Sequence, residues 1–178
     1  QQMHPDAVIC AVGSSPAKPP IPGIDKAHHA LYCYDKPEAV GKKVIMIGGG
    51  LIGCETGYWL ADTGHQVHVL EMREDLAMDA LPSHRAALLP RMAKTMTWNC
   101  SVTVTEVTEN GVKFPSQDGQ EHFLEADTVL YAVGQRANRA DAQALHTAAP
   151  FVREVGDCIR PANITKAVYE GYHAALDI

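Results

Sequence analysis

A glycine-rich turn between an apolar strand and a helix most constrains how this chain can fold. Residues 44–47 are a short apolar run with β-branched side chains, typical of a buried parallel strand. Gly48, Gly50 and Gly53 follow with the spacing G-x-G-x-x-G, and residues 51–63 have helical character. Any glycine-rich turn can join a strand to a helix. A strand, this glycine spacing and a helix, in that order, form a much more specific pattern than a glycine-rich turn alone.

Each glycine in this turn has a physical role. Gly48 allows a tight turn, Gly50 lets the backbone approach a pyrophosphate, and Gly53 lets the helix pack close to the strand. The first helical N–H groups, near Leu51 and Ile52, lack partners within the helix and carry the positive end of its dipole. The sequence therefore predicts a dinucleotide site at the turn.

A carboxylate follows the next expected strand, residues 66–70. Glu71 lies about 20 residues past the glycines, where an acid can accept hydrogen bonds from a ribose 2′-hydroxyl. The same carboxylate repels a 2′-phosphate, which favours NAD over NADP. Arg73 lies just beyond it and could hold a 2′-phosphate, so NADP stays open as the alternative.

Composition and charge narrow the class of protein. Hydrophobic residues make up 46% and charged residues 20%, an ordinary globular balance, and the net charge of −6 argues against nucleic acids and acidic membranes as partners. No stretch approaches the length of a membrane span and no leader is recognisable, so a cytoplasmic setting is expected. The chain starts without Met, which suggests a piece of a larger protein.

The five cysteines predict neither a metal site nor a disulfide framework. No two form C-x-x-C, and none cluster as zinc or iron–sulfur ligands would. We interpret them as free thiols in a reducing compartment. Cys54, one residue past the turn, is expected to pack the start of the helix rather than to act in catalysis. No metal site is predicted.

The regions around the central unit contain further expected elements. Residues 16–23 are too rich in proline for a helix or central strand and are predicted to form a boundary. Residues 83–92 look helical, although Pro90 should end or kink that helix. Strands are expected at 101–107, 112–114 and 121–124, with turns at Asn110-Gly111 and Asp118-Gly119, and together predict an inserted antiparallel meander.

Two segments of the chain have similar sequences. Residues 127–134 (DTVLYAVG) match residues 6–13 (DAVICAVG) in pattern, and each predicts a buried strand that ends near a glycine. A strand at 152–155 leads to Gly156-Asp157, and a helix is expected at 164–176 with Asn163 as its N-cap. The strands near the two ends are predicted to pair with each other or with a second copy of the chain, so a homo-oligomer is possible.

Taken together, these segments resemble the pyridine-nucleotide-binding part of two-dinucleotide-domain flavoproteins. GGGLIGCE is similar to that family's NAD fingerprint, and VGDC to its flavin-contacting segment. The ending GDCIRPANITKAVYEGYHAA resembles NADH:flavin oxidoreductases of the 2-enoate reductase and 2,4-dienoyl-CoA reductase type, which join an old-yellow-enzyme barrel to such a module. The resemblance implies an α/β fold: a Rossmann-like parallel sheet with the inserted meander.

The resemblance also implies domains and cofactors. Residues 24–149 would form the NAD(H)-binding domain, and residues 1–23 and 150–178 would be remnants of an FAD-binding domain. In that family NADH reduces FAD, an iron–sulfur cluster (4Fe-4S) relays electrons to FMN, and the barrel reduces an activated carbon–carbon double bond. Because this chain has neither the cysteines for a cluster nor the length for a barrel, it is expected to bind NADH and to need the rest of a parent flavoprotein for turnover.

Site residues follow from the same resemblance. Val12 and Val133 replace the family's usual Thr, which leaves the backbone contacts unaffected. Hydride transfer between stacked rings needs orientation rather than a protein acid or base, so no catalytic residue is predicted. The residues implied to hold the pyrophosphate are Gly48, Gly50, Leu51, Ile52 and Gly53; Glu71 would bind the ribose; Glu55, Val133 and Gly134 would lie at the nicotinamide; and Ala11, Gly13 and Asp157 would contact FAD. Gly49, Met72 and Arg73, which adjoin these positions, are also predicted to bind the cofactor.

Two other functions remain open from the sequence. A disulfide-reductase-like flavoprotein would need a redox cysteine pair outside this chain. A nucleotide-sensing domain would bind NAD without any electron transfer.

Overall fold

The computed structural model describes residues 4–116 and 119–178, and the chain divides into two compact units. The larger unit is Lys18–Gly134, and the smaller combines the described residues up to Ala17 with Gln135–Ile178. This division differs from the boundaries expected at 23/24 and 149/150, because residues 135–137 pair with residues 14–16. The assignment of the chain's two ends to an FAD-binding domain stays a prediction.

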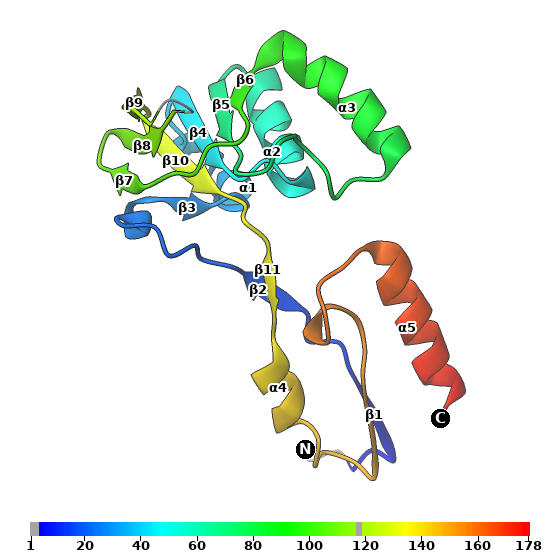
Figure 1. The fold of residues 1–178 in the computed structure, drawn as a ribbon. Coiled ribbons are helices and arrows are strands. Elements are labelled where there is room, and N and C mark those ends of the chain that lie inside the picture. Colours follow the sequence, from blue (N-terminus) through cyan, green and yellow to red (C-terminus); the bar gives the residue numbers. More distant parts are fainter. Residues whose placement is uncertain (1–3, 117–118) are drawn as a thin grey trace. The chain divides into compact units, whose positions relative to one another are not determined.

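A five-stranded parallel sheet forms the centre of the larger unit (Figure 1). The strands expected at 44–47, 66–70 and 127–133 are all present in it, the last as a shorter strand. In spatial order the strands are β3 (His28–His29), β10 (Thr128–Tyr131), β4 (Lys43–Ile47), β5 (Gln66–Leu70) and β6 (Thr97–Asn99); short helical turns η1 (Ile24–Lys26), α1 (Tyr32–Asp35) and η2 (Pro37–Ala39) precede β4.

Strand β4 shows why this sheet needs a cover on both faces. Successive side chains of a strand point to opposite faces, so Val44 and Met46 enter one apolar core, while Ile45 and Ile47 enter a second. Helices α2 (Leu51–Asp62) and α3 (Pro82–Thr95) pack on the first face. The meander packs on the other, as Figure 1 shows. A continuous apolar run is the sequence pattern of such a doubly covered strand.

The inserted meander is confirmed. It consists of β7 (Glu106–Thr108), β8 (Gly111–Pro115) and β9 (Glu121–Glu125), all antiparallel. The turn between β7 and β8 is Glu109-Asn110, one residue earlier than the expected Asn110-Gly111, because Gly111 already pairs with Thr108. The strand predicted from residue 101 is shorter than expected, because residues 101–105 run as an irregular segment with Val102 and Val104 buried. The second expected turn includes Asp118, which lies outside the described residues.

Helix α3 extends further than the sequence predicts. Pro90 was expected to end the helix or kink it, and α3 does not end there but continues five residues to Thr95. Leu88 and Met92, on either side of Pro90, are both buried in the core against α2 and the sheet. Tertiary packing of these side chains therefore outweighs the lost backbone hydrogen bond.

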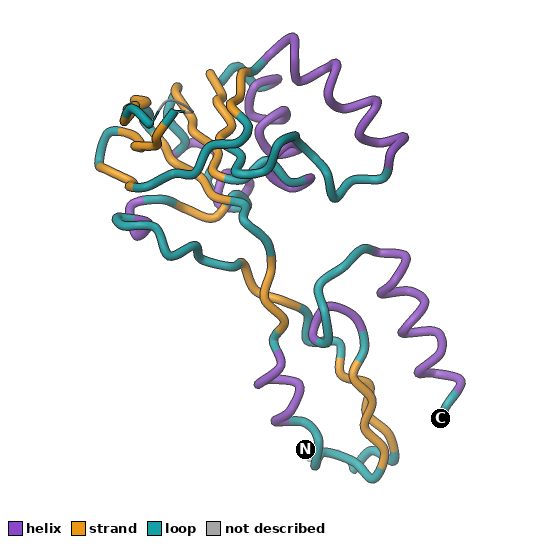
Figure 2. The backbone as a smooth tube through the Cα atoms, in the orientation of Figure 1, coloured by secondary structure: helices purple, strands orange, loops and turns teal. Residues whose placement is uncertain are grey.

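The smaller unit contains two short strand pairs and the C-terminal helix (Figure 2). The prediction that the strands near the two ends pair with each other is confirmed, because β1 (Ala7–Cys10) runs parallel to β12 (Phe151–Glu154). Asn163 caps the last helix as expected, accepting a hydrogen bond from Lys166 N. The remaining elements are β2 (Ser14–Pro16), antiparallel to β11 (Gln135–Ala137), then α4 (Arg139–Ala144), η3 (Gly156–Cys158) and α5 (Ile164–Leu176). In the described part of the chain, no helix combines the length and apolarity needed to cross a membrane.

Candidate nucleotide-binding site

A cleft of about 720 Å³ opens at the carboxyl ends of β4, β5 and β10 in the larger unit. After β4 the chain builds outward through β5 and β6, whereas β10 returns to the other side of β4. Such a reversal of strand order is where ligands bind in open α/β sheets. The cleft has the size of a small-molecule site and is lined mainly by apolar atoms.

The glycine turn forms one wall of this cleft, and two of its glycines are sterically required. Gly48 has a φ of +102°, which side-chain-bearing residues rarely adopt, and a Cβ there would lie 2.4 Å from Ala132 O. A Cβ on Gly53 would lie 2.0 Å from Gly48 O. Helix α2 can therefore begin directly above the turn only because both positions lack a side chain.

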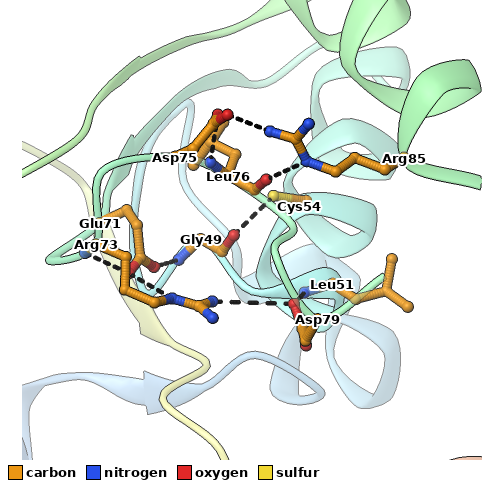
Figure 3. Close-up of polar contacts among 9 residues, drawn as sticks. All are labelled: Gly49, Leu51, Cys54, Glu71, Arg73, Asp75, Leu76, Asp79 and Arg85. Atoms are coloured by element: carbon orange, nitrogen blue, oxygen red, sulfur yellow. Dashed lines mark hydrogen bonds and ion pairs between the residues drawn. The ribbon is translucent and has the colours of Figure 1, made fainter. Parts of the chain in front are cut away.

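Glu71 is almost completely buried, with 3% of its surface exposed, and its carboxylate holds the turn in place (Figure 3). Its Oε2 accepts a hydrogen bond from Gly49 N at 2.5 Å. Its Oε1 accepts from Arg73 N at 2.7 Å and from Arg73 Nε at 3.2 Å. A carboxylate has about four lone-pair sites, so these three hydrogen bonds within the chain leave one site unused.

A residue that the sequence did not single out lies at the start of α2. Asp79 comes from the loop between β5 and α3, and its Oδ1 accepts a hydrogen bond from Leu51 N at 2.8 Å. The guanidinium of Arg73 lies between the two acids, with Nη2 3.9 Å from Asp79 Oδ1 (Figure 3). The loop is itself tied to the turn, because Ala77 N donates to Gly49 O at 2.7 Å.

Most predicted residues of the larger unit meet in the cleft. Gly49 of the turn and Gly53 of α2 do not line the cleft. Glu55 points elsewhere, with Oε1 3.1 Å from His84 Nε2 of α3. The nicotinamide contact expected of Glu55 stays a prediction. The predicted residues that line the cleft are Gly48, Gly50, Leu51, Ile52, Glu71, Met72, Arg73, Val133 and Gly134; residues 19–22, Asp79 and residues 102–105 line it without having been predicted.

The residues predicted to contact FAD belong to the smaller unit. Ser14, next to Gly13, donates a hydrogen bond through Oγ to Asp157 Oδ2 at 3.2 Å. Asp157 Oδ1 accepts another from Ala162 N at 3.1 Å. Ala11 directly follows β1 and is exposed. The fold therefore brings Ser14, and with it the adjacent Gly13, close to Asp157, which lies 143 residues from Ser14 in the sequence. The role of Gly13 and Asp157 toward a flavin stays a prediction.

Cys54 is expected to be chemically inert. Its thiol is fully buried and donates to Gly49 O at 3.2 Å, and burial raises its pKa to about 12. Because the thiolate is the reactive form, a higher pKa means slower alkylation below pH 12. At pH 8, we expect iodoacetamide to label the half-buried Cys100 at least tenfold faster than Cys54 in the folded chain. Peptide mapping by mass spectrometry checks this; equal labelling would contradict a purely packing role for Cys54.

No group of three or more His, Cys, Asp or Glu side chains among residues 4–116 and 119–178 is arranged to hold a metal ion. The cleft of the larger unit combines apolar walls with a helix N-terminus, the cation of Arg73 and the carboxylates of Glu71 and Asp79. Fold and site together define a Rossmann-type nucleotide-binding domain.

Comparison with known proteins identifies the family. The model of the pyridine nucleotide-disulphide oxidoreductase family matches residues 1–171, and this chain belongs to that family. It is thus part of a group of flavin-dependent NAD(P)H oxidoreductases.

Several relatives are similar along nearly all of this chain. Bilirubin reductase of Mediterraneibacter gnavus is 39% identical over 97% of the chain, and cinnamate reductase of Clostridium sporogenes is 30% identical over 97%. A solved structure of 2-naphthoyl-CoA reductase with 2-naphthoyl-CoA has a TM-score of 0.92 and 31% identity over 98% of the chain. The chain spans only 27%, 26% and 27% of these three proteins, respectively.

Proposed function

We propose that this chain is the NADH-binding part of a flavin-dependent reductase whose final acceptor is an activated carbon–carbon double bond, such as a 2-enoate or an enoyl-CoA. The observation that carries the proposal is the cleft at the strand reversal, with the glycine turn, the α2 N-terminus and Glu71 on its walls. Support for the acceptor class comes from relatives named cinnamate reductase and 2-naphthoyl-CoA reductase. Cytoplasmic location belongs to the same proposal.

The residues of the cleft fit a dinucleotide. Leu51 N and the backbone at Gly50 present the positive end of α2 to a pyrophosphate. Glu71 offers a fixed acceptor for a ribose hydroxyl. Two apolar side chains of the cleft are exposed, Met72 to 72% and Val133 to 39%. They offer surfaces for the adenine and nicotinamide rings at the two ends of the dinucleotide.

NADH, when bound, would supply the hydride that reduces a flavin. The task of this chain is to bind and orient the dinucleotide, since the transfer requires aligned rings rather than a proton donor. FAD would be held by the smaller unit through Gly13 and Asp157 together with the rest of a parent protein. FMN and a 4Fe-4S cluster would lie elsewhere in that parent, and no step here depends on them.

NADH is proposed over NADPH because the charges near Glu71 disfavour a second phosphate. Arg73, the residue that could hold a 2′-phosphate, is already paired with Glu71 and lies near Asp79. A 2′-phosphate would have to compete with these carboxylates and would meet their repulsion.

Calorimetric titration of the chain with NADH, NADPH and FAD in turn tests the proposal. We expect NADH to bind at least tenfold more tightly than NADPH. Tighter binding of NADPH would assign the ribose site to Arg73 and overturn the NADH preference. Binding of FAD in competition with NADH would mean that this turn holds the flavin nucleotide instead.

Two alternative functions predict other behaviour in a longer protein. A disulfide-reductase-like flavoprotein would lose activity on alkylation of a redox cysteine pair outside residues 1–178. A purely sensing domain would bind NADH and never bleach the flavin absorbance under anaerobic conditions. Rapid anaerobic bleaching by NADH, insensitive to alkylation, supports the proposed reductase over both.

A further inference from the structure

The anion-binding end of helix α2 carries an acceptor from the chain itself. The N–H of Leu51 points to the cleft end of the helix, and Asp79 Oδ1 accepts its hydrogen bond at 2.8 Å (Figure 3). A hydrogen bond from an N–H to a carboxylate is charge-assisted, and the helix dipole strengthens it further. Asp79 thus makes with this helix the interaction that a phosphate would make.

The position of Asp79 coincides with the pyrophosphate position of the proposed nucleotide site. A Cβ built on Gly50 would lie 3.3 Å from Asp79 Oδ2 and 3.6 Å from Arg73 Nη2. Gly50 is the residue whose missing side chain lets a pyrophosphate approach the backbone. The carboxylate and the guanidinium therefore occupy the space directly above that glycine.

Asp79 is held there by a connected set of contacts, yet its side chain remains accessible. Ala77 N binds Gly49 O, and the buried Leu76 is bound through its carbonyl by Arg85 Nε at 2.8 Å, which together fix the loop. The Asp79 side chain is 53% exposed and lines the cleft. A rotation about its own side-chain bonds can release Leu51 without moving the anchored backbone.

We propose that Asp79 is an affinity-determining residue of the nucleotide site, a built-in competitor that must leave the α2 N-terminus before a pyrophosphate can bind. This inference rests on the proposed function. One N–H cannot serve two anions, and a pyrophosphate beside an unmoved carboxylate would suffer like-charge repulsion. The free energy of displacing Asp79 is therefore subtracted from the binding free energy of the dinucleotide.

The same displacement changes the role of Arg73. While Asp79 is in place, the Arg73 guanidinium is shared between Asp79 and Glu71. When Asp79 leaves, Arg73 keeps its bond to Glu71 and its Nη2 becomes available to the incoming phosphate. The Arg73 side chain is already 42% exposed, so the phosphate can reach it. Release of the competitor thereby supplies a cation for the pyrophosphate.

The test compares Asp79→Asn with Asp62→Asn by calorimetric titration of the full chain with NADH and with ADP. Asp62 is the exposed last residue of the same helix, so its replacement changes the net charge equally but at the opposite end. We expect Asp79→Asn to bind both ligands about tenfold more tightly than the unchanged chain, and Asp62→Asn to stay within about twofold of it. ADP carries the diphosphate without the nicotinamide, which locates the gain at the pyrophosphate.

A second readout is the amide resonance of Leu51 in NMR spectra. In the unchanged chain NADH should shift this resonance, and Asp79→Ala should shift it without ligand. If the unchanged chain binds NADH but Asp79→Asn binds it no more tightly, the inference is wrong and the proposed function stands. A gain for NADH without one for ADP would also overturn it. If neither the unchanged chain nor the variants bind NADH, the proposed function fails and this inference with it.

Discussion

Replacing Glu71 by Ala should weaken NADH binding by about a hundredfold, the largest effect on affinity expected for a single side chain of the cleft. Two losses combine. The ribose loses its hydrogen-bond acceptor. Gly49 N loses the hydrogen bond to Glu71 Oε2, at 2.5 Å, that holds the turn in place. Hydrogen bonds to a charged group contribute about 1.5–3 kcal/mol each, and a tenfold change in affinity corresponds to about 1.4 kcal/mol.

Calorimetric titration with NADH measures this loss, and Glu74→Ala is the matched control. Glu74 lies on the following loop, is exposed and does not line the cleft, so the same charge is removed nearby without touching the turn. Its variant should bind NADH within about twofold of the unchanged chain. Equal losses in both variants would mean that a specific contact of Glu71 is not what governs binding, since removing a negative charge should by itself favour an anionic ligand.

Replacing Gly53 by Ala should lower the free energy of unfolding by about 3 kcal/mol or more and abolish NADH binding. The new Cβ would lie 2.0 Å from Gly48 O and 3.1 Å from Gly48 C, and both atoms belong to the backbone. Since no side chain can rotate away, helix α2 must separate from the turn. Overpacked cores typically lose about 1–3 kcal/mol, and a backbone collision lies at the upper end.

Gly57→Ala on the same helix provides the control for this second variant. Its added Cβ would meet the terminal methyl group of Met96 at 3.0 Å, and a flexible methionine side chain can move aside. Urea unfolding should therefore give a loss of stability below about 1 kcal/mol. If both alanines destabilise the chain equally, the contact between Gly53 and Gly48 is not what positions the helix.

The central unit could be predicted from sequence because its signals are local. Apolar runs mark β4 and β5, and the glycine spacing marks the turn between β4 and α2. The Asn110-Gly111 pair similarly marked the hairpin between β7 and β8 to within one residue. Each pattern lies within a few residues, where backbone sterics and side-chain periodicity act directly.

Other features depend on contacts that no local pattern records. Pro90 is tolerated within α3 because its neighbours Leu88 and Met92 are buried against the sheet. The strand expected from residue 101 begins only at Glu106, since Val102 N bonds the backbone oxygen of Glu71 instead of a neighbouring strand of the meander. In both cases tertiary contacts outweigh the intrinsic preference of the segment.

Sequence patterns alone were sufficient to predict a glycine turn with dinucleotide-type spacing, a parallel sheet and an acid at the end of the second strand of the unit. The surroundings of these features depend on the three-dimensional fold. Asp79 lies 28 residues from Leu51, in a loop without periodicity, and reaches the α2 N-terminus because Ala77 anchors that loop to Gly49. Local sterics can be deduced from neighbouring residues, whereas an interaction between distant segments exists only once folding has brought them together.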